Sequence, residues 1–500
     1  MKYKKVMSVF DGTLRIRSEP NGTSEICGSV SSGESVLVEE DKVKSSSGEE
    51  YYKLAGNGYI NAAWMQEKSN QTDLSEQVIE KLADKETLDK TYENTNQILT
   101  AVRDKKPVIV RYGMKINKND SNPETRCTYI YDAEGMTPAR MNFTTGTFEF
   151  GDWKDIFFVK NNYPAMVKYD GTEDYKLDPN DHTKKADGTE SDVSNTSYNG
   201  NAMSVFDGSG ENGKIWLSQY EDEDAEYMII SNVQYDESYH DDAYVREDGS
   251  HADKLYYPMF GGSYDGTRLR SLAGQALMYN TNTQTEINRA KANGAGWNIG
   301  SWSKRNLLDC MLKIMSKTDN SQTAFGQGQT SGYVNDASQN YGHLATGTLT
   351  NKGQFFGYKD TTHEVKVFYI EKWWGNRWDR INGLLMVGGE ILAKMTPPYN
   401  LTGKDFEKVG ITFASSGSGW QKGTKSSRFG RIVNSTGGSS STYTCDYFWW
   451  NAGITAVALV GGDCNAGACC GADYLHLSHS AGNASWYVGA SVFLEQPIAA

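Results

Sequence analysis

The sequence predicts a mostly β protein with a few helices, in the α+β class. Its 500 residues are 12% aromatic and include 51 Gly but only 10 Pro, a composition typical of loop-rich β proteins. Short β-forming runs such as Ile454–Val460 and Tyr487–Leu494 alternate with turns rich in Gly, Asn and Ala. A chain of this length can form two to four domains.

Charge and cysteine content exclude several classes of protein. The net charge of −13, with no basic stripe, argues against nucleic acid as a partner. The sequence contains no run of about eighteen apolar residues, so no membrane span is predicted. The first residues, MKYKKVMSVFDG, lack the apolar core of a secretory signal. Seven scattered cysteines favour synthesis in a reducing cytoplasm. Cys464, Cys469 and Cys470 lack the spacing of a zinc site, so we expect no metal and no cofactor.

Residues 1–67 are predicted to form a small β domain, because short apolar strands alternate with glycines. This region resembles the bacterial SH3-like (SH3b) family, and the resemblance implies that it forms a small β-barrel. The matching segments are Leu14–Pro20, Gly33–Val36, Tyr52–Leu54, Gly58–Ile60 and Trp64. Peptidoglycan binding and a structural adaptor role both remain open, because a fold does not specify a ligand.

Residues 68–105 are predicted to form a helical linker. Apolar residues occupy six of nine heptad core positions: Leu74, Val78, Leu88, Tyr92, Leu99 and Val102. This short repeat fits two alternatives. One is a stem that sets a homo-oligomer, with a trimer favoured, and the other is a lone amphipathic helix.

Residues 106–254 are predicted to be β-rich, and are a candidate first half of the C-terminal domain. A hairpin is expected from Ile215–Gln219 and Glu226–Ile230, whereas the polar residues 169–214 are expected to be loops. Further strands are expected at Val108–Tyr112, Cys127–Asp132, Phe148–Trp153 and Ile156–Lys160.

Residues 255–500 are predicted to form the C-terminal domain. Ser303 begins a helix through Lys317. Val365–Ile370 is expected to be a strand, and Leu384–Met395 a hairpin around Gly388-Gly389.

The segment Trp373–Asp379 lies between that strand and the hairpin. It resembles the Gly-Asn-Val-Trp-Glu-Trp signature of the formylglycine-generating-enzyme branch of the C-type-lectin-like fold, through Gly375-Asn376 and Trp378-Asp379. The resemblance implies that Trp374, Asn376 and Trp378 are scaffold beneath the surface loops. The enzymes use two cysteines with copper; Cys470 lies near one of them in position, but Val492 and Phe493 stand where the second is expected. We therefore expect no oxidase activity and no catalytic residues.

The chain more closely resembles tail-associated proteins of phages and prophages of gut bacteria, some of which are variable proteins of diversity-generating retroelements. The segments that carry this likeness are 122–126, 267–271, 324–328, 395–399 and 461–492. It implies a virion tail protein, made in the host cytoplasm, that contacts other tail proteins and binds a glycan or protein receptor on a bacterial surface.

Aromatic and short polar residues on turns near the C-terminus have the composition of a binding surface. The alternative is a cell-wall-associated SH3b protein with a vestigial enzyme-like domain. The residues predicted to bind the ligand are Asp446, Tyr447, Trp449, Asp463, Ala466, Cys469, Asp473, His476, Ser478, His479 and Tyr487.

Overall fold

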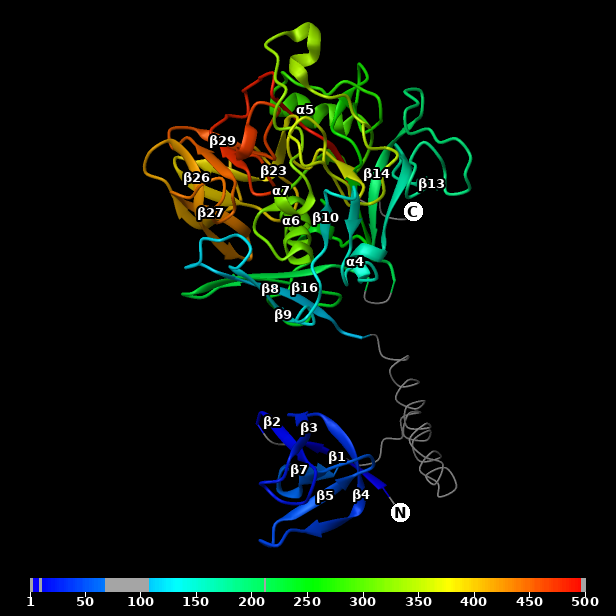
Figure 1. Cartoon of the computed structure of the whole chain (residues 1–500), viewed down its shortest axis with the longest axis vertical. Helices are drawn as coiled ribbons and strands as arrows, with labels where there is room; N and C mark the ends of the chain where they lie inside the picture. The colour runs from blue at the N-terminus through cyan, green and yellow to red at the C-terminus, as the bar shows by residue number, and fades with distance from the viewer. Residues whose placement is uncertain (1–2, 9–10, 68–107, 211–212, 496–500) are drawn as a thin grey trace. The chain divides into compact units, whose positions relative to one another are not determined.

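The computed structural model describes residues 3–8, 11–67, 108–210 and 213–495 (Figure 1). The chain divides into two compact units, Met1–Pro107 and Val108–Ala500, each described here by itself. Strands dominate both units, which confirms the mostly β prediction. The predicted helical linker at 68–105 lies outside the described residues. None of the helices in the described ranges is long and apolar enough to cross a membrane.

The first unit is a seven-stranded antiparallel sheet in the order β3-β2-β6-β5-β4-β1-β7. Its core contains Leu14, Val30, Val38 and Ile60. The bounds are β1 (Tyr3–Ser8), β2 (Thr13–Arg17), β3 (Ile26–Ser31), β4 (Ser35–Lys44), β5 (Glu50–Leu54), β6 (Tyr59–Asn61), η1 (Ala62–Trp64) and β7 (Met65–Glu67).

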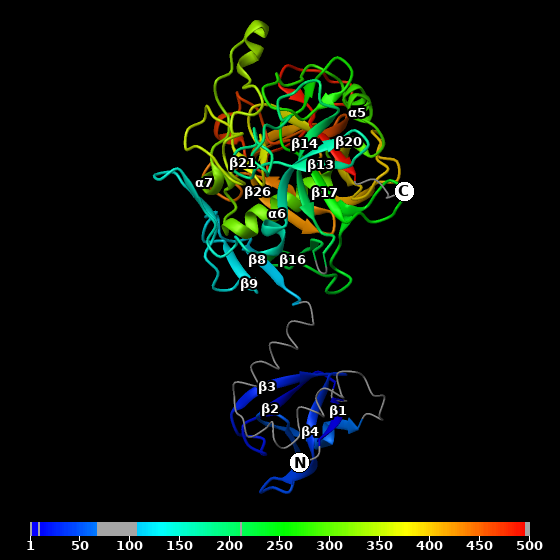
Figure 2. The ribbon, with the colours of Figure 1, turned by 90° about the vertical axis from the view of Figure 1, so that its right-hand side faces the viewer.

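Helix α6 (Trp302–Ser316) is the centre of the second unit (Figure 1 and Figure 2). Ser301 caps its first turn, with its side chain accepting from the N–H of Lys304, and Lys317 ends it in the left-handed conformation. This confirms the predicted helix. Every residue of α6 is buried, because the helix contacts β8 and β16 as well as β23 and β27.

Three sheets surround this helix. The four-stranded sheet, in the order β15-β16-β8-β9, contains the predicted hairpin. Its bounds are β8 (Arg111–Asn117), β9 (Cys127–Tyr131), β15 (Trp216–Glu221) and β16 (Ala225–Ser231).

The six-stranded sheet has the order β13-β12-β14-β17-β32-β20. It joins residues on both sides of position 254, because β17 pairs with both β14 and β32. Regions 106–254 and 255–500 therefore form one unit. The bounds are β12 (Asn162–Lys168), β13 (Glu173–Lys176), β14 (Gly200–Asp207), β17 (Lys254–Pro258), β20 (Trp297–Ile299) and β32 (Val492–Glu495).

The nine-stranded sheet has the order β25-β24-β23-β29-β30-β28-β26-β27, and β31 pairs with β23. The predicted two-glycine hairpin is confirmed: Gly388 and Gly389 join β23 to β24 at positive φ. The bounds are β23 (Trp378–Val387), β24 (Glu390–Ala393), β25 (Glu407–Thr412), β26 (Gly417–Ser427), β27 (Gly430–Thr436), β28 (Tyr447–Trp450), β29 (Thr455–Val460), β30 (Leu475–Leu477) and β31 (Val488–Gly489).

Short elements complete the second unit. The small hairpins are β10 (Arg140–Asn142) with β11 (Thr147–Glu149), β18 (Ser263–Tyr264) with β19 (Leu269–Arg270), and β21 (Lys366–Val367) with β22 (Ile370–Glu371). The remaining helices are α4 (Phe157–Lys160), η2 (Asp242–Tyr244), α5 (Thr283–Lys291), α7 (Ser321–Phe325), η3 (Ala337–Gly342) and η4 (Gly467–Cys469).

Several local predictions are wrong. The run 365–370 is a hairpin rather than one strand, because Phe368 and Tyr369 adopt positive φ and reverse the chain. Residues 156–160 contain α4 instead of a strand, and the predicted strand at 148–153 reaches only Glu149. The expected loop 169–214 contains β13 and the buried strand β14, and the expected strand 487–494 is divided into β31 and β32.

Candidate functional site

The predicted binding residues belong to β28, β30 and the loops around them, in the middle of the nine-stranded sheet. β30 pairs in parallel with β28, which places His476 opposite Trp449, and in antiparallel with β29. The parallel pairing brings residues 448–450 alongside 475–477.

A continuous band of side-chain rings runs across this region. Trp449 is 41% exposed, and its ring centroid lies 6.0 Å from that of His476 and 5.5 Å from that of Tyr447. At the other end, Trp486 stacks on Tyr333 with centroids 4.2 Å apart. The other contacts that make the band continuous are Tyr447–Trp420, His476–His479, His479–Tyr487, Tyr487–Trp486 and Trp486–Tyr341. We call this set of rings the aromatic band.

Two neutral histidines form the middle of the aromatic band. Burial lowers the pKa of His476 well below its usual value, and lowers that of His479 to about 4. His476 Nδ1 accepts from the backbone N–H of Ser478, at 3.3 Å. His479 Nδ1 lies 3.2 Å from His476 Nδ1, and His479 Nε2 lies 3.0 Å from the Tyr487 hydroxyl. The Tyr487 contact is satisfied when the Tyr487 O–H donates to Nε2 of a neutral His479.

Eight of the predicted residues reach the surface at least in part: Tyr447, Trp449, Ala466, Cys469, Asp473, Ser478, His479 and Tyr487. His476 is only 7% exposed and lies beneath Trp449 and His479. Asp463 is also buried: its carboxylate accepts from the indole N–H of Trp378, at 2.9 Å, and burial raises its pKa to about 6. Asp463 therefore supports the loop from inside and is not a surface contact.

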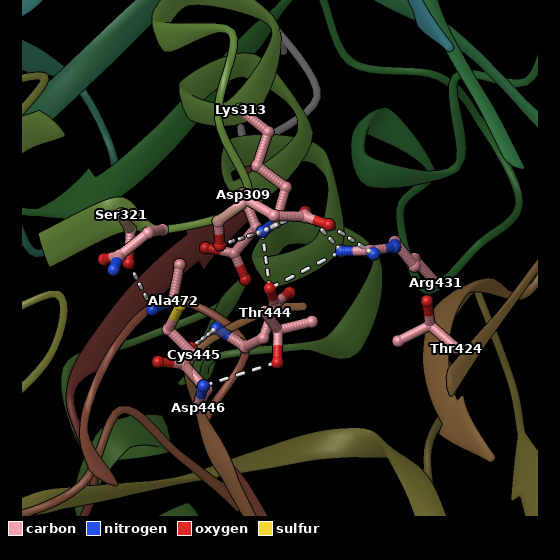
Figure 3. A network of polar contacts seen from close by, with 12 residues as sticks. Asp309, Lys313, Ser321, Thr424, Arg431, Thr444, Cys445, Asp446 and Ala472 are labelled. Atoms are coloured by element: carbon pink, nitrogen blue, oxygen red, sulfur yellow. Dashed lines mark hydrogen bonds and ion pairs between the residues drawn. The ribbon is translucent and has the colours of Figure 1, made fainter. Parts of the chain in front are cut away.

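The prediction of a surface role is also corrected for Asp446, which is buried, and Asp473, which is mostly buried. Both belong to a charge network in which Figure 3 labels Asp446, Lys313 and Arg431. Asp473 bonds to Lys313 of α6 and lies 3.6 Å from Arg431 of β27. Asp446 is 3% exposed, and its carboxylate accepts from the backbone N–H of Asp473 at 2.7 Å. Burial, with the nearby charge of Asp473, raises the pKa of Asp446 well above its usual value. These carboxyl groups fix the loop that precedes β30.

Arg431 connects this network to three parts of the second unit. Its guanidinium binds Asp319 with two bonds of 2.8 and 2.9 Å, and its Nε donates to Glu226 of β16 at 2.6 Å. The cations Arg431 and Lys313 hold the pKa of Asp319 far below its usual range, despite burial. The loop under the aromatic band is thus tied to α6, β16 and β27.

Sequence reasoning missed part of the aromatic band. Tyr333 and Tyr341 belong to a loop more than a hundred residues before β28, so no local pattern connects them with Trp486. The neighbouring pair Trp486-Tyr487 offered a usable signal. The scaffold prediction placed Trp374, Asn376 and Trp378 beneath the surface loops, and all three are at most 2% exposed.

The described ranges contain no built site for metal binding or for thiol chemistry. No group of three or more His, Cys, Asp or Glu side chains there could hold a metal ion. All seven cysteines are free thiols. Burial raises the pKa of Cys464 to about 12 and that of Cys469 to about 11, so neither is an activated nucleophile.

Comparison with known proteins adds no family assignment. No protein-family model matches the chain, and no curated protein matches it in sequence.

Proposed function

We propose that the chain is a receptor-binding protein of a phage tail, which binds a glycan or protein on the bacterial surface through the aromatic band. The single observation that supports this most is the band of contacting rings at the surface. The part of the chain that supplies most of these rings, residues 443–494, adds few charged side chains. Residues 443–494 contain no Lys, Arg or Glu, and their three aspartates lie mostly inside. Rigid rings with short polar neighbours are typical of binding surfaces.

The domain identities are part of this proposal. The compact seven-stranded first unit, with its short antiparallel strands, supports the SH3-like resemblance and a role in attachment to the virion or the cell wall. Buried Trp374, Asn376 and Trp378 beneath surface loops support the C-type-lectin-like resemblance of the second unit.

Self-association is supported by a second surface, on the four-stranded sheet. Among described residues, the second unit has eight exposed large hydrophobic residues, and five of them lie here: Val108, Ile109, Tyr131, Tyr220 and Tyr235. The guanidinium of Arg111 lies 4.1 Å from the ring of Tyr131 and 4.0 Å from that of Tyr235. Exposed tyrosine and arginine are enriched at protein interfaces. The surface begins directly after the heptad pattern, so we propose a second copy of the chain as its partner.

Receptor binding is tested with purified full-length protein on a panel of bacterial strains. Trp449→Ala and Trp486→Ala should each reduce binding to a strain that the natural chain recognises by tenfold or more, on the scale of about 1.4 kcal/mol per tenfold. Tyr264→Ala, which removes a 42% exposed ring of the second unit outside the aromatic band, is the matched control. Unchanged binding by both folded variants would reject the aromatic band as the receptor site.

A further inference from the structure

Glu364 and Asn376 contact each other in the interior, where they are 3% and 1% exposed. The Asn376 amide nitrogen donates one hydrogen to Glu364 Oε1 and the other to the carbonyl of Leu344, at 3.2 Å. The Leu344 contact fixes the orientation of the amide, so Asn376 Oδ1 is an acceptor that needs a donor. Neither Asn376 Oδ1 nor Glu364 Oε2 has a hydrogen-bond partner among the described residues.

No nearby cation is paired with Glu364 in the described part of the chain. Glu371 accepts from the backbone N–H groups of Gly347 and Leu349, at 3.0 and 3.1 Å. Lys372 Nζ pairs with Asp379, at 2.9 Å. Burial raises the pKa of the Cys464 thiol, and the charge of Glu364 also contributes to that rise. Burial, reinforced by the charge of Glu371, raises the pKa of Glu364 to about 8.

We propose that Glu364 is a positioning residue that carries a proton on Oε2 at neutral pH and donates it in a hydrogen bond to Asn376 Oδ1. An ionised Glu364 would leave two buried oxygen acceptors without a donor, which is costly. A protonated carboxyl satisfies both, because acid and amide then each donate one hydrogen bond and accept one.

The pair holds the loops that carry the aromatic band, so its positioning role rests on the proposed function. The backbone N–H of Asn376 donates to Gln329, at 2.6 Å, and its carbonyl accepts from Cys464, at 3.0 Å. Together with the Leu344 bond, these contacts fix both ends of the segment 329–344, which carries Tyr333 and Tyr341. They also fix the loop that follows Gly462.

This assignment predicts a pH dependence of known sign. The folded chain holds the Glu364 proton more tightly than the unfolded chain, whose carboxyl ionises near pH 4.5. Stability from this pair is therefore complete below about pH 4.5, declines as the pH rises to about 8, and is constant above that.

Glu364→Gln tests the proposal, because the glutamine amide can donate to Asn376 Oδ1 at every pH. Unfolding of the full chain is followed by tryptophan fluorescence, since eleven of the twelve tryptophans lie in the second unit. Between pH 5 and pH 8, the midpoint of the natural chain should fall by several degrees relative to the variant. Infrared spectra at pH 7 should show one protonated carboxyl fewer in the variant.

Glu371→Gln is the matched control: it should destabilise the chain at every pH, because that carboxylate accepts from backbone N–H groups. Parallel midpoint curves for the natural chain and Glu364→Gln, an unchanged carboxyl band, or failure of Glu364→Gln to fold would each overturn the proposal. These readouts need no receptor, so they decide the protonation of Glu364 even if the Trp449 and Trp486 variants show that the aromatic band binds nothing.

Discussion

His479 stacks on His476 with ring centroids 4.3 Å apart and Nδ1 atoms 3.2 Å apart. Two protonated imidazoles could not share this contact, since both nitrogens would be donors. The aromatic band is therefore built around a pair that must stay at least partly neutral.

Acid should weaken this part of the fold. The unfolded chain takes up a proton on each histidine near pH 6.5, whereas folded His479 does so only near pH 4 and burial holds the pKa of folded His476 well below its usual value. Stability is therefore lost as the pH falls from about 6.5 to about 4. His479→Gln should reduce that loss, measured as the midpoint of thermal unfolding from pH 7 to pH 4. His363→Gln, at an exposed histidine, is the control; equal losses in the natural chain and the His479 variant would contradict the prediction.

Asp473→Asn tests the interior network. The change leaves Lys313 and Arg431 with one carboxylate fewer in a buried site, which typically costs about 3–5 kcal/mol. Denaturant unfolding should show that loss, whereas Asp224→Asn, at an exposed aspartate, should change stability little. A fully stable Asp473 variant would contradict the role of Asp473 in the charge network and favour a role as a surface contact.

Trp378→Ala should destabilise the second unit by about 3–5 kcal/mol, since the ring is 2% exposed and its N–H donates to Asp463. The expected readout is a lower unfolding midpoint or aggregation. Trp449→Ala, which removes a ring of the aromatic band at the surface, should be far milder. A stable Trp378 variant that had lost only binding would contradict the scaffold role.

The sequence was a good guide wherever local chemistry decided the structure. The helix predicted from Ser303 to Lys317 is present at Trp302–Ser316, although its cap is Ser301, and the glycine pair at 388–389 forms the predicted turn. Periodicity failed at 365–370, where the chain is buried on both sides and apolar patterning carries no direction. Composition failed at β14, because the polar stretch 169–214 predicted loops and yet contains this buried strand. For Asp446 and Asp473, residue type suggested the surface. Asp473 instead pairs with cations at residues 313 and 431, and Asp446 accepts from the backbone of Asp473; no local pattern connects these residues.

Residues 1–67 should fold alone, because the first unit has its own sheet and core. Expression of 1–68 should give a single cooperative melting transition by circular dichroism. Val38→Ala, at a fully buried core position, should lower that transition. A gradual, non-cooperative change for the natural fragment would reject this domain as an independent unit.

The surface formed by Val108, Ile109, Tyr131, Tyr220 and Tyr235 should control self-association. Replacing Tyr131, Tyr220 and Tyr235 together by Ser removes apolar area that is already 40–49% exposed, so the fold should survive. Sedimentation of the full chain over a range of concentrations should show the natural protein as an oligomer and the triple variant shifted toward monomer. Tyr264→Ser removes a ring that is 42% exposed but lies outside this surface, and it should leave the oligomer unchanged. If the triple variant keeps the natural oligomer, association depends on the segment 68–105 or another surface, and the four-stranded sheet is not the interface. If the natural chain is monomeric at every concentration, the proposed homo-oligomer is wrong.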